Sequence, residues 1–204
     1  MRYLLFGMST AFGQTDYEHG GWAGRLRQWL DTKEKRCHFH NLAISGDTTR
    51  DVLGRMESET RVRLRGKPKK EWTMFISLGG NDARVEDDVS KVPEDEYREN
   101  VLRILTLAKE LTGHVLWVGD SPVVEDVCNP WKGYIFFLNE RIKMYERIAK
   151  EVCQAEHVPF IEIFSVLEAR SDLRDLTDDG LHPNAKGHLL IFEEIKKSLE
   201  SAGI

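Results

Sequence analysis

The chain has 204 residues, of which 29 are Lys or Arg and 34 are Asp or Glu, so its formal net charge is −5. This length fits one domain with a sizeable core, and we expect a single domain over residues 1–204. The basic residues form no block that would track a phosphate backbone, so nucleic acid is not an expected partner. No stretch approaches the ~20 apolar residues that a membrane-spanning helix needs.

The cysteines favour a reducing compartment. Cys37, Cys128 and Cys153 are an odd number at unrelated spacings, which is typical neither of a disulfide framework nor of a zinc site. The first six residues are too short for the apolar region of a secretion signal and lead straight into a predicted strand. We therefore expect a cytoplasmic protein with reduced thiols.

Short apolar runs alternate with amphipathic stretches along the whole chain. In chain order, we predict a strand at 3–6, a helix near 22–30, a strand at 37–44, a helix near 52–64, a strand at 73–78, a helix at 93–113, a strand at 115–118, a helix at 135–156, a strand at 158–163 and a last helix at 184–201. This alternation predicts a three-layer α/β/α sandwich around a parallel sheet of about five strands. Ligands of such sheets bind beyond the carboxyl ends of the strands, so we expect the chemistry in the loops there.

The first of these loops contains a serine between glycines. The stretch 6–13 reads FGMSTAFG, and Ser9 follows the first predicted strand directly. A serine in this place can act as a nucleophile, cradle a phosphate or simply turn the chain. A nucleophilic Ser9 would need a base, an acid that orients the base, and donors for the oxyanion.

A base and an orienting acid occur together in the stretch DDGLHPN at 178–184. Asp179 precedes His182 by three residues in a Gly- and Pro-containing turn before the last helix. Such a turn can hold a carboxylate against one ring nitrogen and leave the other facing the site. The alternatives are an ordinary turn in which Asp179 caps the helix, or use of Asp178 instead. His188 on the last helix is a weaker candidate base.

Two further loops offer oxyanion donors. Gly46 in NLAISGDTT lacks a Cβ, so its backbone N–H can approach a ligand closely. Asn81 in SLGGNDA carries a side-chain NH₂ that is neutral at every pH. Each has an ordinary structural interpretation as well, Gly46 as a turn residue and Asn81 as a helix cap.

Taken in order, these blocks resemble those of the GDSL or SGNH hydrolases, a superfamily of serine esterases and lipases with a flavodoxin-like sheet. The matching positions are Gly7, Ser9 and Gly13 in the first block, Gly46 in the second, Gly79, Asn81 and Asp82 in the third, and Asp179, His182 and Pro183 in the fourth. The matches span nearly the whole chain. The family usually has Asp where this chain has Met8, which is the main departure.

The resemblance implies a mechanism and a set of site residues. Ser9 would attack an ester carbonyl, His182 would take its proton, and Asp179 would orient the imidazole. The Ser9 N–H, the Gly46 N–H and the Asn81 side chain would form the oxyanion hole. We also expect the substrate-binding site to be lined by Met8, Asp82, Ser121 and Trp131. The literal letters G-D-S occur at 119–121, but Pro122 removes the next backbone donor, so Ser121 is not the predicted nucleophile.

The expected activity is therefore hydrolysis of a small or short-acyl carboxylic ester through an acyl-enzyme intermediate, without metal or organic cofactor. Three alternatives remain at this point. The same site could serve an acyltransferase or thioesterase, or the chain could be a non-catalytic flavodoxin-like module that cradles a phosphate with its first loop. The third is an inactivated family member that kept the fold, for which Met8 is the only sequence hint. The sequence predicts a small-molecule ester as partner and leaves the oligomeric state open.

Overall fold

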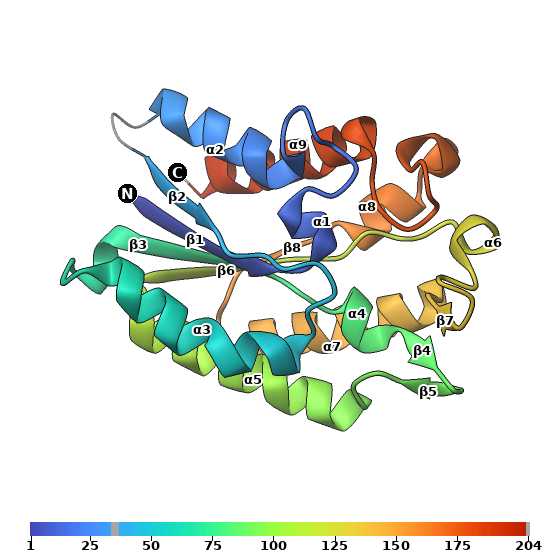
Figure 1. Ribbon diagram of the computed structural model, residues 1–204. Coiled ribbons are helices and arrows are strands. Elements are labelled where there is room, and N and C mark those ends of the chain that lie inside the picture. Colours follow the sequence, from blue (N-terminus) through green and yellow to red (C-terminus); the bar gives the residue numbers. More distant parts are fainter. Residues whose placement is uncertain (34–36, 203–204) are drawn as a thin grey trace.

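The protein is built around a five-stranded sheet, as shown by a computed structural model that describes residues 1–33 and 37–202 (Figure 1). The strands lie in the order β2 (His38–Asn41), β1 (Arg2–Gly7), β3 (Trp72–Ser77), β6 (His114–Val118) and β8 (Phe160–Ile161). Every neighbouring pair in this sheet is parallel. The order is that of flavodoxin-like folds, with the chain reversing direction across the sheet next to β1. The predicted parallel α/β sheet is confirmed.

Helices cover both faces of the sheet and complete the three layers (Figure 1). One face carries α2 (Gly21–Lys33) and α9 (Ala185–Ser201), and the other carries α3 (Thr49–Leu64), α5 (Glu94–Leu111) and α7 (Asn139–Ala155). The start of α3 is fixed by a capping box, in which the Asp51 carboxylate accepts hydrogen bonds from the Thr48 N–H and hydroxyl. Asn184 caps α9 in a similar way through the N–H groups of Lys186 and Gly187.

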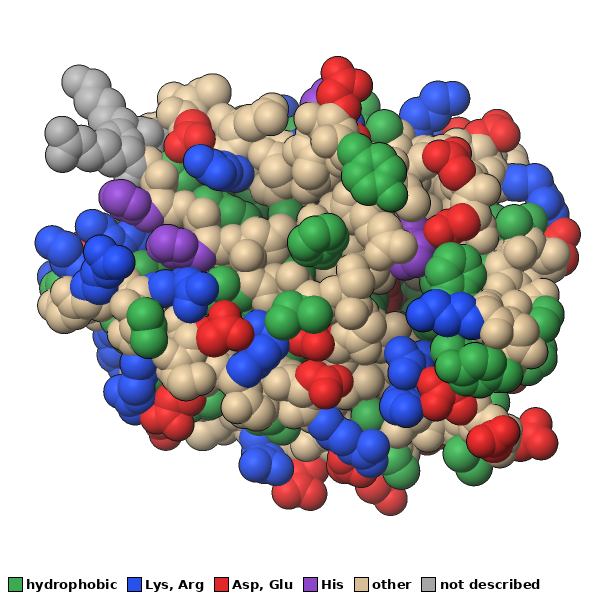
Figure 2. Space-filling model, viewed as in Figure 1, with side chains coloured by type: hydrophobic (Ala, Val, Ile, Leu, Met, Phe, Trp, Pro, Cys, Tyr) green, Lys and Arg blue, Asp and Glu red, His purple; other side chains and the backbone are tan. Residues whose placement is uncertain are grey.

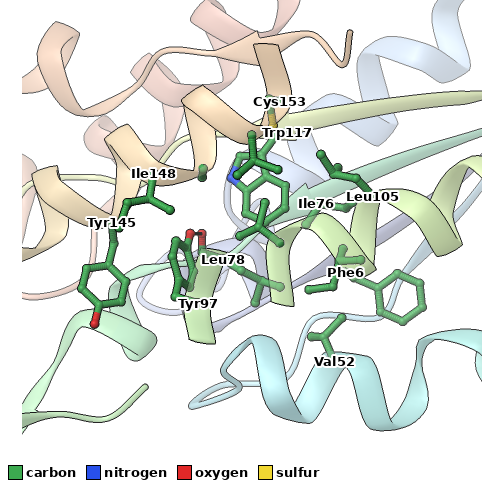
Figure 3. Packing of buried hydrophobic residues seen from close by; sticks show 14 of the residues in the cluster. Phe6, Val52, Ile76, Leu78, Tyr97, Leu105, Trp117, Tyr145, Ile148 and Cys153 are labelled. Carbon is green, nitrogen blue, oxygen red and sulfur yellow. Dashed lines mark hydrogen bonds between the residues drawn. The ribbon is translucent and has the colours of Figure 1, made fainter. Parts of the chain in front are cut away.

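The strand period of two places apolar residues on both faces of β1. Leu4 and Phe6 belong to the core beneath α3, α5 and α7, whereas Tyr3 and Leu5 pack towards α2 and α9. Figure 3 shows the first of these cores, in which Tyr97 of α5 and Tyr145 of α7 lie side by side, 4.8 Å between ring centroids. Burial on both faces explains why these strands read as continuous apolar runs.

Two strands and one helix are shorter in the structure than the sequence pattern predicts. The strand predicted at 37–44 ends at Asn41, whose side chain accepts the Ala43 N–H and turns the chain. The strand predicted at 158–163 is only Phe160–Ile161. The helix predicted from 135 begins at Asn139, because β7 (Ile135–Phe136) pairs with β4 (Val85–Glu86) instead.

Short elements fill the loops at the carboxyl end of the sheet. A second, three-stranded sheet has the order β5 (Val89–Ser90), β4 and β7. The remaining short elements are α1 (Ser9–Phe12), α4 (Gly80–Ala83), α6 (Glu125–Cys128) and α8 (Phe164–Glu168), with 3₁₀ turns at η1 (Lys69–Glu71) and η2 (Leu173–Leu176). Within the described ranges, no helix combines the length and the apolar character needed to cross a membrane.

Candidate active site

Ser9 lies at the carboxyl end of β1, where the chain passes directly into α1. The turn needs small residues on both sides. A Cβ on Gly7 would lie 2.5 Å from the Ala11 Cβ, and Gly13, which ends α1, has a φ of 94°. Ser9 is therefore held at the start of a short helix, with 9% of its surface exposed.

His182 and Asp179 meet Ser9 from the turn before α9. The His182 Nε2 lies 3.0 Å from the Ser9 Oγ, and its Nδ1 lies 2.7 Å from the Asp179 Oδ2. The other Asp179 oxygen accepts the backbone N–H groups of His182 at 2.7 Å and Leu181 at 2.9 Å. Asp178 instead accepts a hydrogen bond from the Asn184 side chain, so Asp179 is the carboxylate on the ring.

The charge of Asp179 fixes the roles of the two ring nitrogens. Burial opposes its ionisation, but the hydrogen bonds from the His182 ring and backbone and from the Leu181 N–H outweigh burial, and the pKa of Asp179 falls from 3.8 to about 2. An ionised carboxylate can only accept hydrogen bonds, so Nδ1 carries the proton that is donated to it. In the neutral ring, Nε2 then faces the Ser9 hydroxyl as an acceptor.

An aromatic side chain shields the imidazole from solvent. The Trp131 ring stands edge-on to the His182 ring, with 5.6 Å between centroids and 73° between planes. His182 is 5% exposed. Figure 2 shows hydrophobic side chains gathered near a histidine on this face, over the loops next to β7. His188, the weaker candidate base, is fully buried, with its ring 3.0 Å from the Gln14 carbonyl oxygen and 3.3 Å from the Trp22 nitrogen.

Both expected oxyanion donors lie at the same cavity as Ser9. Gly46 lines it with a φ of 94°, and a Cβ built there meets no atom within 4 Å, so its backbone conformation rather than crowding favours glycine. Asn81 also lines the cavity and is 6% exposed. Its Nδ2 donates to the Asp47 carbonyl at 3.1 Å and contacts the Met8 sulfur at 3.5 Å. The first of these contacts fixes the direction in which the amide points.

The cavity has a volume of about 200 Å³ and an apolar wall opposite the loops of β1 and β3. The wall consists of Val123, Trp131, Ile135, Phe137, Ile142 and Leu181. Of the expected lining residues, Met8, Ser121 and Trp131 lie on this cavity. Asp120, Arg84 and Lys132 line it as well. Sequence reasoning missed most of this wall, because β7 cannot be told from the start of a helix by periodicity alone.

Asp82, which was expected beside the substrate, does not reach the cavity. It is fully buried and accepts hydrogen bonds from the Thr49 N–H at 2.9 Å and the Thr49 hydroxyl at 2.5 Å. Asp82 thus joins α4, the short helix that carries Asn81, to the start of α3. Ser121 lines the cavity, but the His182 Nε2 faces Ser9 and lies 3.0 Å from its hydroxyl oxygen.

The sequence matches the model of the GDSL-like lipase/acylhydrolase family over residues 5–190. The chain belongs to this family. Among curated relatives, it is 23% identical to the human isoamyl acetate-hydrolyzing esterase 1 homolog, covering 98% of this chain and 81% of the human protein. It is 22% identical to the GDSL esterase/lipase CPRD49 of Arabidopsis thaliana, covering 98% and 78%.

Solved structures with the same fold include other acylhydrolases. The lipase/acylhydrolase of Enterococcus faecalis superimposes with a TM-score of 0.74 at 22% identity, covering 98% of this chain and 96% of the other. An acetylxylan esterase of Geobacillus stearothermophilus gives a TM-score of 0.72 at 19% identity, covering 96% and 92%. The predicted family and its enzyme class, the carboxylic ester hydrolases, are confirmed. Family membership favours a hydrolase over the flavodoxin-like binding module.

Proposed function

We propose that this protein is a serine esterase that hydrolyses small carboxylic esters through Ser9, His182 and Asp179. The observation that carries the proposal is the continuous hydrogen-bond chain from the Ser9 hydroxyl to the ring and on to the carboxylate, 3.0 and 2.7 Å long, at the wall of a cavity. A serine is a weak nucleophile unless a positioned base accepts its proton. The ring nitrogen that faces Ser9 is the one left free by the carboxylate.

The reaction follows from this geometry in two halves. Ser9 Oγ attacks the ester carbonyl while His182 Nε2 takes the hydroxyl proton, and the resulting imidazolium is stabilised by Asp179. His182 then returns the proton to the departing alcohol, which leaves the acyl group on Ser9. A water molecule enters, gives its proton to His182 and releases the acid by the reverse steps.

The negative charge on the tetrahedral intermediate would be met by three donors: the backbone N–H groups of Ser9 and Gly46 and the Asn81 amide. Donors of this kind act strongly because they are already oriented before the charge develops. In support, the Asn81 amide is held by the Asp47 carbonyl. The positive φ of Gly46 turns its peptide at the edge of the same cavity.

The cavity supports a short acyl or alkyl group as substrate. About 200 Å³ bounded by an apolar wall favours a compact apolar group over a long chain. The names of two relatives refer to acetyl esters, isoamyl acetate for the human relative and acetylxylan for the Geobacillus enzyme. We therefore propose acetyl or similarly short esters, with transfer of the acyl group to an alcohol or hydrolysis of thioesters as the alternatives for the same site.

The test is hydrolysis of 4-nitrophenyl acetate by the wild type, Ser9→Ala and Ser121→Ala. Both serines line the cavity, so Ser121→Ala is a matched control for loss of a hydroxyl. We expect Ser9→Ala to lose activity by at least ~10³-fold, because it removes the nucleophile itself, and Ser121→Ala to stay within a few-fold of wild type. Full activity in Ser9→Ala would disprove the proposal. Product analysis with added alcohol or with a thioester separates the alternatives.

We also propose that the protein is cytoplasmic. Cys128 and Cys153 are buried thiols that form no disulfide, and burial raises their pKa to about 11 and about 12, which keeps them unreactive. Such thiols suit a reducing compartment. Fractionation of cells that express the protein tests this, and recovery of the mature protein outside the cytoplasm would refute it.

A further inference from the structure

Three carboxyl groups are buried close behind the cavity without a cation beside them. Asp82 is 0% exposed, and Asp120 and Glu146 are each 9% exposed. Within residues 1–33 and 37–202, none of the three takes part in a salt bridge, and each has at least one buried oxygen without a hydrogen bond of good geometry. Buried acids usually have such partners. The exception therefore needs an explanation.

Asp120 is the member of this group that lines the cavity together with Ser9 and His182. It follows β6, and its Oδ1 accepts the Ser121 N–H at 3.0 Å. Its Oδ2 makes no hydrogen bond of good geometry and lies against Gly80, whose backbone N–H lowers the pKa of the carboxyl and where a Cβ would lie only 2.5 Å from the oxygen. Gly80 immediately precedes Asn81, so the Asp120 carboxyl supports the turn that carries this oxyanion donor.

Met8 approaches Gly80 at the same spot. The built Cβ of Gly80 lies 3.2 Å from the Met8 Cε, so the methionine and the Asp120 carboxyl approach Gly80 together. Met8 is buried and contributes no charge; its sulfur contacts the Asn81 Nδ2 at 3.5 Å. At Gly80 the loop after β6 thus contributes an acid and the loop after β1 contributes an apolar side chain.

Given the proposed esterase activity, we propose that Asp120 is a positioning residue of the active site, which holds the Gly79–Asn81 turn and supplies a buried carboxyl to the cavity. Through the turn, it fixes the Asn81 donor relative to Ser9. Through its charge, it acts on the His182 imidazolium that forms when Ser9 attacks. A carboxylate near an imidazolium stabilises the protonated ring.

The groups around Asp120 determine when it carries this charge. Asp82 of α4, Tyr97 of α5 and Glu146 of α7 surround it, and His182 faces it from the turn before α9. Burial raises the pKa of Asp120 from 3.8 to about 6, against the opposing effects of the Ser121 N–H, the Gly80 N–H and His182. Asp120 therefore carries its negative charge above about pH 6 and is largely neutral well below it.

The experiment compares the pH dependence of kcat/KM for wild type, Asp120→Asn, Asp120→Ala and the control Asp126→Asn, with thermal melting to verify folding. Asp126 is an exposed acid six residues further along. Asp120→Asn retains an oxygen for the Ser121 N–H but loses the negative charge that stabilises the imidazolium. The acid limb of its kcat/KM profile should therefore move to lower pH by roughly half a unit or more. Asp120→Ala should also lower kcat about 10-fold with little change in KM. Asp126→Asn should behave as wild type.

Met8→Asp tests the contact that Met8 and Asp120 share at Gly80 directly. Alone, it places two carboxyls at Gly80 and should lower kcat more than Asp120→Asn does. Combined with Asp120→Asn, it should regain most of that loss, a coupling that independent sites do not show. Equal losses from Met8→Asp in both backgrounds, or an acid limb unchanged in Asp120→Asn, would overturn this role while leaving the esterase proposal intact. An inactive wild type would overturn both.

Discussion

Replacing Glu146 by Gln is expected to stabilise the protein at neutral and alkaline pH. Glu146 is 9% exposed, and neither carboxyl oxygen has a hydrogen bond of good geometry among the described residues. Burial, together with the charges of Asp120 and Glu162, raises the pKa of Glu146 from 4.5 to about 8, because these effects outweigh the weak hydrogen bonds from the Phe164 and Asp120 N–H groups. Between these two values, the folded state keeps a proton that the unfolded chain has released. Wild-type stability therefore falls as pH rises through this window and levels off above about 8.

The size of the effect follows from the same shift. At 1.36 kcal/mol per pKa unit, a shift from 4.5 to about 8 corresponds to on the order of 5 kcal/mol. Local relaxation and water entry reduce such penalties, so we expect Glu146→Gln to gain ~2 kcal/mol or more at pH 8.5. At pH 4.5 the two proteins should be nearly equally stable, because the folded wild-type side chain is then protonated and about half of the unfolded chains are protonated too.

Urea unfolding at pH 4.5 and pH 8.5 measures this difference. Glu140→Gln is the matched control, since Glu140 is exposed on the same helix, and it should change the unfolding free energy little at either pH. Two results would refute the reasoning that burial of Glu146 is poorly compensated. One is a Glu146→Gln protein that is less stable than wild type at pH 8.5; the other is an equal change in unfolding free energy at both pH values.

Three further predictions concern the proposed reaction. Asn81→Ala should lower kcat by ~10²–10³-fold with little change in KM, since it removes one oxyanion donor; steady-state kinetics on a folded variant would exclude this role if kcat were unchanged. Asp179→Asn should lower kcat by ~10²–10⁴-fold, because the amide no longer holds the His182 proton on Nδ1, and normal turnover would contradict it. Trp131→Ala should raise KM for short esters more than it lowers kcat, and an unchanged KM would remove Trp131 from the substrate wall.

The sheet could be predicted from the sequence because burial on both faces leaves a strong signal. The strand predicted at 73–78 corresponds to Trp72–Ser77, whose residues are all buried. The small sheet of β5, β4 and β7 could not be predicted, since two-residue strands carry no readable period. The second strand ends earlier than predicted for a local reason, because the Asn41 side chain accepts one backbone N–H.

The site was predicted in part for a similar reason. Ser9, Asn81 and His182 stand in short blocks with fixed neighbours, and the structure brings them to one cavity. Asp82 belongs to the same block as Asn81, but adjacent residues on a short helix point in different directions, and Asp82 faces α3 instead. The contact between Asp120 and Gly80 joins loops 40 residues apart, which no local pattern in the sequence reveals.

The central claim is that Ser9 is an activated nucleophile, and covalent labelling tests it most directly. The folded protein would be treated with a fluorophosphonate probe, and the modified peptide located by mass spectrometry in wild type and in His182→Ala. The account predicts an adduct on Ser9 that disappears when His182 is replaced. An adduct on Ser121, or no adduct in a folded wild-type protein, would contradict it.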